Sequence, residues 1–156
     1  MERENKKICF VASSGGHLEE LMCLKEIMEE NDSFFVTEKS GQITEKSLNN
    51  AYIVRQINRH EKFFLWHFIK LFISAQEILK TEQPDVIITT GALVCFPFCL
   101  LAKIKGKKII YIESFARVNE KSLTGKLMQP IADLFIVQWE SMLKCYPNAK
   151  YTGGIF

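Results

Sequence analysis

Short apolar runs of strand character alternate with segments of helical character along almost the whole chain. Most of these runs are unbroken stretches of Ile, Val, Phe and similar side chains, as in strands that are buried on both faces. The expected strands occupy residues 8–12, 33–37, 51–54, 86–90, 108–112, 134–137 and 150–152. Strands separated by helices favour a parallel sheet with right-handed crossovers and helices on both faces. The sequence therefore predicts an α/β fold with a doubly wound parallel sheet.

The segments between these runs carry the apolar spacing of helices. Leu21, Leu24 and Met28 repeat at helical intervals with charged residues between them, which predicts a helix over residues 18–28. Further helices are expected over residues 60–81, 93–104, 124–132 and 141–145. The polar segment 38–50 is expected to be a loop or a short helix. At 156 residues, the whole chain is expected to form one domain with a proper core.

A glycine-containing turn, residues 13–17, joins the first expected strand to the first expected helix. Ser14 can cap that helix, and Gly15 and Gly16 let the backbone turn sharply and bring free N–H groups close to a ligand. Bare amides at a helix N-terminus attract anions, phosphate above all. His17 adds a group that can donate, accept or carry a proton near neutral pH. The alternative is a tight turn with a surface histidine, because a Gly-Gly pair alone is a weak signal.

Three polar turns are expected to meet at one edge of the predicted sheet. In open parallel sheets, ligands bind at the carboxyl ends of the strands. This rule brings together residues 13–17, 89–91 and 113–117. Thr90 and Gly91 join the turn residues as candidates for substrate binding.

Composition excludes several classes of function. The net charge is only +2, and no cluster of Lys and Arg interleaved with aromatic residues is present, which argues against nucleic-acid binding. The polar start of the chain predicts neither a signal peptide nor a preceding membrane span. The five cysteines are scattered, and Cys95 and Cys99 have no His or acidic neighbours, so we expect no metal, no cofactor and a reduced cytoplasmic setting.

Two segments are unusually apolar for a helix that covers a sheet. Residues 63–73 are apolar nearly all round, and residues 92–102 are apolar and followed at once by lysines. Neither reaches the roughly 20 apolar residues that span a bilayer. Both have the composition of segments that lie in a membrane interface, with lysines near the headgroups. The alternative is core helices between the sheet and a partner subunit. The aromatic candidates for such a membrane or partner contact are Phe64, Phe68, Phe96 and Phe98.

Four motifs, in this order, resemble the accessory, acceptor-side subunit of split GT-B glycosyltransferases. They are residues 13–17, 113–118, 132–139 and 151–154. One branch of the family serves bacterial capsule and exopolysaccharide synthesis. The other is the eukaryotic membrane-anchoring subunit of the UDP-GlcNAc transferase that adds the second GlcNAc to dolichol-diphosphate-GlcNAc.

The resemblance covers nearly the whole chain and extends to the N-terminal half of the GlcNAc transferase that makes lipid II. There too, a Gly-Gly-His loop follows the first strand. The eukaryotic members begin with a transmembrane helix, which we do not expect in this chain. The resemblance therefore implies peripheral attachment to the cytosolic face of the plasma membrane.

What the resemblance implies for function is one half of a two-part enzyme. A GT-B enzyme needs two Rossmann-like halves, and the donor nucleotide-sugar usually binds the C-terminal one. This chain is expected to supply the acceptor half, and a separate catalytic protein the donor half. The expected reaction is transfer from a UDP-sugar to a polyprenyl-diphosphate-linked saccharide, with this subunit non-catalytic or co-catalytic and inactive alone.

The expected reaction, together with the position of the polar residues at the carboxyl edge of the predicted sheet, suggests roles for them. The amides around Gly15 and Gly16 would hold the acceptor diphosphate or approach the donor phosphates. His17 and Glu113 are candidates to orient or deprotonate the attacking hydroxyl. Arg117 would pair with Glu113 or with phosphate, the alternative being a structural salt bridge at a strand end.

The chain ends on Ile155 and Phe156, two apolar residues that suggest docking to the partner protein. Two readings from other classes stay open. One is a self-sufficient small α/β enzyme that binds a nucleotide or phosphate ligand with the same glycine turn. The other is a pure membrane scaffold that recruits the catalytic subunit and touches no substrate.

Overall fold

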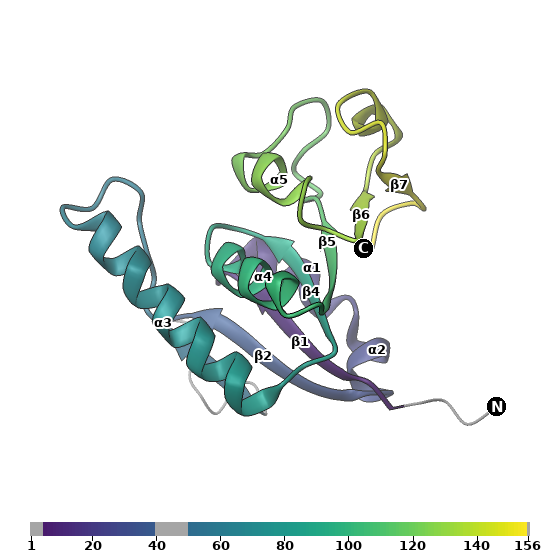
Figure 1. Ribbon diagram of the computed structural model, residues 1–156. Helices are drawn as coiled ribbons and strands as arrows, with labels where there is room; N and C mark the ends of the chain where they lie inside the picture. Colours follow the sequence, from purple (N-terminus) through teal and green to yellow (C-terminus); the bar gives the residue numbers. More distant parts are fainter. Residues whose placement is uncertain (1–4, 40–49, 156) are drawn as a thin grey trace.

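All seven strands of the described chain lie in one parallel sheet, in the order β3-β2-β1-β4-β5-β6-β7 (Figure 1). The computed structural model describes residues 5–39 and 50–155. The strands are β1 (Lys7–Ala12), β2 (Asp32–Glu38), β3 (Ala51–Val54), β4 (Val86–Gly91), β5 (Lys108–Ile112), β6 (Leu134–Val137) and β7 (Lys150–Tyr151). The predicted α/β, doubly wound, Rossmann-like fold is confirmed.

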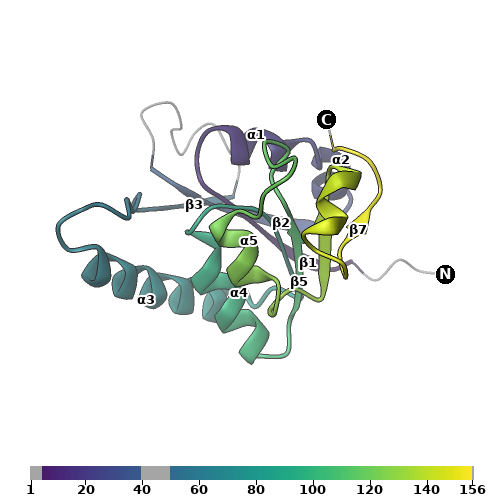
Figure 2. The ribbon, with the colours of Figure 1, turned by 90° about the horizontal axis from the view of Figure 1, so that it is seen from above.

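Helices cover both faces of this sheet (Figure 2). On one face lie α1 (Gly16–Met22) and α2 (Lys25–Glu29), and on the other lie α3 (Phe64–Glu82) and α4 (Cys95–Ile104). Two shorter elements follow β5 and β6, namely α5 (Leu123–Met128) and the 3-10 helix η1 (Glu140–Lys144).

The two faces of the sheet carry separate apolar cores, and β1 contributes to both. Phe10 and Ala12 pack with Leu21 of α1, whereas Cys9 and Val11 pack with the residues of α3 and α4. Side chains alternate between the faces of a strand, so a strand with helices on both faces must be apolar at every position. This explains the unbroken apolar run at residues 8–12.

The helix expected over residues 18–28 is two helices. The N–H groups of Cys23 and Leu24 bond to carbonyls three residues back, those of Glu20 and Leu21, at 3.2 and 3.0 Å. Such tight bonds are typical of a helix end, and the chain turns there before α2 begins.

Proline shortens a second expected helix. The segment 124–132 was expected to be helical throughout, but α5 ends at Met128. Pro130 has no N–H to donate to the carbonyl four residues back, that of Lys126, so the run of helical hydrogen bonds stops before it. α3 also begins at Phe64 rather than near residue 60. Residues 40–49, most of the segment expected to be a loop or a short helix, lie outside the described residues.

The sheet has its topological switch point between β1 and β4. From β1 the chain winds outward to β2 and β3, and from β4 it winds the other way to β7. Val11 pairs with Thr89, but Ala12 pairs with Gly91, so Thr90 is an extra residue that makes a β-bulge in β4. Ligands of open α/β sheets bind at such a switch point, beyond the carboxyl ends of the strands.

Candidate functional site

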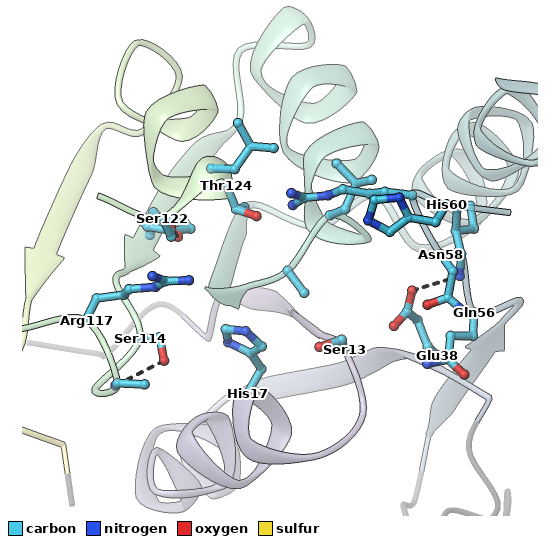
Figure 3. Close-up of a pocket in the computed structure, with 17 residues that line it drawn as sticks. Ser13, His17, Glu38, Gln56, Asn58, His60, Ser114, Arg117, Ser122 and Thr124 are labelled. Atoms are coloured by element: carbon cyan, nitrogen blue, oxygen red, sulfur yellow. Dashed lines mark hydrogen bonds between the residues drawn. The ribbon is translucent and has the colours of Figure 1, made fainter. Parts of the chain in front are cut away.

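A cavity of about 530 Å³ opens at the carboxyl edge of the sheet (Figure 3). Its walls come from the turn after β1, the end of β2, the segment after β3, the loop after β4 and the segment between β5 and α5. Its polar lining includes Ser13, His17, Glu38, Gln56, Asn58, Arg59, His60, Ser114, Arg117 and Ser122. Residues of the predicted turns 13–17 and 113–117 thus line one cavity, whereas near the third turn the wall is formed by Ala92 and Leu93 and not by residues 89–91.

The glycine turn differs from expectation in one detail. Gly15, not Ser14, is the N-cap of α1, and no side chain caps this helix. Gly15 has φ of 88°, a conformation that residues with a side chain disfavour. Because α1 begins at Gly16, Ser14 lies one residue before the N-cap position. Ser13 and His17 line the cavity, whereas Ser14, Gly15 and Gly16 do not. Gly15 and Gly16 are exposed beside it.

His17 presents one ring nitrogen to the cavity. Its Nδ1 lies 2.9 Å from the carbonyl oxygen of Thr90, and the Thr90 hydroxyl donates to the His17 carbonyl at 2.5 Å. Because a carbonyl only accepts, Nδ1 carries the hydrogen, and Nε2 of the neutral ring is left as an acceptor. The ring points into the cavity (Figure 3). This arrangement is suited to accepting a proton from a bound hydroxyl.

Thr90 and Gly91 support His17 and do not form the cavity wall. Thr90 is fully buried, and the bulge in β4 turns its carbonyl toward the imidazole. Gly91 has φ of 111°, and a Cβ at this position would lie 3.3 Å from the Tyr111 hydroxyl oxygen and 3.5 Å from Cε1 of His17. Glycine is required here for its backbone conformation and for its lack of a side chain.

Glu113 lies behind the cavity wall with only 1% of its surface exposed. One carboxylate oxygen accepts from the Tyr111 hydroxyl at 3.2 Å and the Ser114 N–H at 3.1 Å. The other accepts from the Ser122 hydroxyl at 3.0 Å and the Tyr146 hydroxyl at 2.7 Å. Burial, together with the Glu113 carboxylate, raises the pKa of both tyrosines, which keeps them as donors. This geometry makes Glu113 a structural anchor, and its predicted catalytic role stays a prediction.

Arg117 lines the cavity from an exposed turn after β5. The backbone N–H of Arg117 donates to the Ser114 carbonyl at 2.9 Å, which closes the turn. The expected pair with Glu113 does not form, because Glu113 is enclosed by its own donors. Within the described residues, the guanidinium has no ion-pair partner and is available to an anion.

Glu20 ties the segment after β5 to α1. Its buried carboxylate accepts from the Ser114 hydroxyl at 2.8 Å, the Phe115 N–H at 3.2 Å and the Gln138 amide at 3.1 Å. The Gln138 oxygen in turn accepts from the N–H of Ile155 at 3.0 Å. These bonds connect the cavity wall to the C-terminal tail.

Glu38 is a cavity residue that the sequence analysis missed. It ends β2, is 6% exposed, and accepts a hydrogen bond from the Ile57 N–H at 3.3 Å. Burial raises the pKa of its carboxyl. The signal was present in the sequence, because the rule that located the other turns also applies to the end of β2.

Comparison with known proteins identifies the family. The family described as "Oligosaccharide biosynthesis protein Alg14 like" matches residues 38–155. The chain belongs to this Alg14-like family. The mouse and human proteins named UDP-N-acetylglucosamine transferase subunit ALG14 are 28% and 26% identical to it, over 98% of this chain and 84% of theirs. The Schizosaccharomyces pombe protein of that name is 48% identical over 45% of this chain and 36% of its own length.

Solved structures share the fold of this Alg14-like chain. MurG of Acinetobacter baumannii superposes with a TM-score of 0.67 and 17% identity, over 87% of this chain and 42% of MurG. UDP-GlcNAc 2-epimerase of Methanocaldococcus jannaschii superposes with a TM-score of 0.72 and 15% identity, over 94% of this chain and 45% of the epimerase. The chain thus spans less than half the length of these proteins, and at such identities the likeness concerns the fold alone.

Of the four phenylalanines expected at a membrane or partner, one is buried in this Alg14-like chain and the other three are half-buried. Phe98 is fully buried between α4 and the sheet, which corrects its assignment to a contact surface. Phe64 and Phe96 are half-buried and each stacks on Phe68, with ring centroids 5.5 and 6.4 Å from it. The reason is that α4 packs against both the sheet and α3.

A different face of α3 is exposed, which we call the α3 outer face. Its apolar side chains are between 53 and 73% exposed, and they are Phe63, Leu65, Trp66, Ile69 and Ile73. Within residues 5–39 and 50–155, no helix is long and apolar enough to cross a membrane. Of the predicted docking residues in the tail, Ile155 is half-buried against the α1 side of the core, and Phe156 lies outside the described residues.

Proposed function

We propose that this chain is the acceptor-binding, co-catalytic subunit of a two-component UDP-sugar glycosyltransferase. Its acceptor would be a polyprenyl-diphosphate-linked saccharide at the cytosolic face of a membrane. The observation that carries the proposal is His17, whose ring lies in a cavity at the switch point of the sheet with Nδ1 held by the Thr90 carbonyl, so that Nε2 is the nitrogen left for a substrate. Family membership supports it, because the relatives are named as subunits of a UDP-N-acetylglucosamine transferase. Assignment to the capsule and exopolysaccharide branch stays a prediction.

In the proposed reaction, an acceptor hydroxyl attacks the anomeric carbon of the UDP-sugar. The bond from that carbon to the UDP phosphate oxygen breaks, and UDP leaves with the electron pair. The hydroxyl proton passes to Nε2 of His17, while Nδ1–H continues to donate to the Thr90 carbonyl. Arg117, with no ion-pair partner among the described residues, would bind a phosphate group.

A separate protein would supply the donor-binding half. The relatives are named as subunits of a transferase, and the cavity lies along one edge of the sheet, where a second lobe can close over it. Within one GT-B chain the two halves face each other across a cleft, and here we propose that two proteins do so. The seven-stranded unit would then act as a single acceptor domain.

The α3 outer face would hold the complex at the membrane. Its apolar side chains are flanked by Lys62 and Lys70, and the Lys70 ammonium lies 5.2 Å from the centre of the Trp66 ring. Aromatic and aliphatic side chains beside lysines are suited to the boundary between acyl chains and anionic headgroups. The face begins directly after residues 56–60, which line the cavity, so a membrane-held lipid would be close to the site.

The test is to assay transfer with separated components. The chain, its catalytic partner and the mixture are each given UDP-GlcNAc and a polyprenyl-diphosphate-linked GlcNAc in vesicles. We expect transfer from the mixture only. Turnover by the chain alone would instead favour the self-sufficient enzyme, and transfer by the partner alone at the rate of the mixture would contradict an acceptor-binding role.

A further inference from the structure

A buried carboxylate that the proposed reaction does not use faces the same cavity. Glu38 is held on a rigid element, because β2 pairs with β1 on one side and with β3 on the other, where Glu38 is opposite Val54. Its neighbour Lys39 donates its N–H to the Val54 carbonyl at 2.8 Å. The carboxylate therefore has a fixed place in the cavity wall.

Only one oxygen of the Glu38 carboxylate accepts a hydrogen bond from the described residues. Oε1 accepts from the Ile57 N–H at 3.3 Å, and Oε2 has no hydrogen-bond donor or salt bridge among residues 5–39 and 50–155. Glu38 is 6% exposed and lines the cavity, so its free oxygen is reached from the cavity and offers an acceptor to a ligand that donates hydrogen bonds.

The groups around Glu38 narrow the chemistry of that ligand. Gln56 and Asn58 line the same end of the cavity and can both donate and accept (Figure 3). A carboxylate accepts from hydroxyls and repels phosphate, so this end suits a sugar. The basic groups Arg59 and His60 are exposed, whereas Glu38 is buried. A phosphorylated sugar would accordingly enter with its hydroxyls inward and its phosphates outward.

We propose that Glu38, together with Gln56 and Asn58, forms the subsite that recognises the hydroxyls of the acceptor's terminal sugar. This inference rests on the proposed acceptor-binding function. Glu38 fixes which hydroxyl lies at His17, because its oxygen holds another hydroxyl of the same ring. Sites that hydrogen-bond a substrate hydroxyl discriminate strongly against analogues that lack it.

The test uses Glu38→Gln in the full chain, assembled with its catalytic partner. Glutamine keeps the size and the acceptor for the Ile57 N–H, but it presents an N–H group where the hydroxyl needs an acceptor. With polyprenyl-diphosphate GlcNAc, we expect kcat/KM for the acceptor to fall roughly 10- to 100-fold, with KM for UDP-GlcNAc unchanged. Glu38→Asp, which keeps the charge, should recover part of the loss. Glu26→Gln, an exposed carboxylate on α2, is the matched control and should have no effect.

A set of deoxy acceptors makes the test specific. For wild type, kcat/KM should fall by a similar factor, roughly 10- to 100-fold, with one analogue that lacks a single sugar hydroxyl. For Glu38→Gln, that same analogue should lower kcat/KM little further, because the hydrogen bond is already lost. Equal kcat/KM for wild type and Glu38→Gln, or independent losses with every analogue, would overturn the subsite while the proposed function stands. Failure of the wild-type pair to use any polyprenyl-diphosphate sugar would overturn the proposed function, and the subsite with it.

Discussion

His17 and Thr90 hold each other through two hydrogen bonds across a separation of 73 residues in the chain. The imidazole donates from Nδ1 to the Thr90 carbonyl, and the Thr90 hydroxyl donates to the His17 carbonyl. The bulge in β4 makes both bonds possible, because Thr90 is the extra residue opposite the end of β1. A backbone feature at the switch point therefore selects the ring nitrogen that faces the cavity.

Removal of the Thr90 hydroxyl tests this clamp. Thr90→Val leaves the His17 carbonyl without that donor, so we expect the free energy of unfolding to fall by about 1–2 kcal/mol in urea denaturation. Thr37→Val is the matched control. The Thr37 hydroxyl is equally buried and has no hydrogen-bond partner in the part of the chain that the structure describes, so this substitution should be neutral or stabilising. Equal losses in both variants would contradict the clamp.

Glu113 is expected to contribute mainly to the stability of the fold. Glu113→Ala removes the acceptor of two buried tyrosine hydroxyls and of Ser122, so the free energy of unfolding should fall by about 3 kcal/mol or more. Gly125→Ala should act on the same bonds, because its methyl group would collide with Glu113 and Tyr146. Glu113→Gln separates the roles. Loss of transfer in a variant that unfolds like wild type would support the predicted catalytic role and contradict the structural one.

Asp133 should make stability depend on acid pH. Its carboxylate pairs with Lys103 at 2.8 Å and accepts from the Ile109 N–H at 2.9 Å, and the Lys103 pair holds the pKa of Asp133 below its ordinary 3.8. The pKa of Asp133 is lower in the folded protein than in the unfolded chain. This stabilisation is therefore present above about pH 4 and is lost as the pH falls through the folded-state pKa.

The measurement for Asp133 is the unfolding free energy of wild type and Asp133→Asn between neutral pH and about pH 3. Asparagine keeps the acceptor for the Ile109 N–H and removes the charge. The difference between the two proteins should be largest at neutral pH and should shrink in acid. A difference that is constant with pH would show that the ion pair contributes nothing.

The α3 outer face is expected to be the surface that contacts lipid. Trp66→Glu or Ile69→Glu should weaken binding to anionic vesicles more than tenfold, because each removes a large apolar side chain worth about 1.5–3 kcal/mol when buried. Ile27→Glu, at a 40% exposed isoleucine on α2, is the control and should bind like wild type. Unchanged co-sedimentation of the α3 variants would assign the face to something other than lipid.

The strands were easier to predict from the sequence than the helix ends. Residues 108–112 and 134–137 are β5 and β6 with the expected bounds, because strands buried on both faces leave unbroken apolar runs. The break after Met22 carries no such local signal, since the spacing of Leu21, Leu24 and Met28 continues through it. The end of α5 was predictable from Pro130.

The site was predictable as a place and less so in its residues. Strand-end turns located His17 and Arg117 correctly at the cavity, because the edge rule depends only on the order of elements. Position alone also selected Glu113, whose burial is decided by Tyr146 and other distant residues. Phe98 was misplaced for a similar reason, since the apolar composition of α4 does not tell which side meets the sheet.

The most direct test of the account is the rate of sugar transfer by the reconstituted pair that carries His17→Ala. His67→Ala is the matched control, because that histidine pairs with Glu61 and does not line the cavity. Assembly with the catalytic partner should be unchanged in both variants. If the chain supplies the acceptor wall and His17 takes the proton, His17→Ala lowers kcat roughly 10²- to 10⁴-fold, while His67→Ala leaves it unchanged. Full transfer by the assembled His17→Ala pair would contradict the account and favour the alternative of a membrane scaffold that touches no substrate.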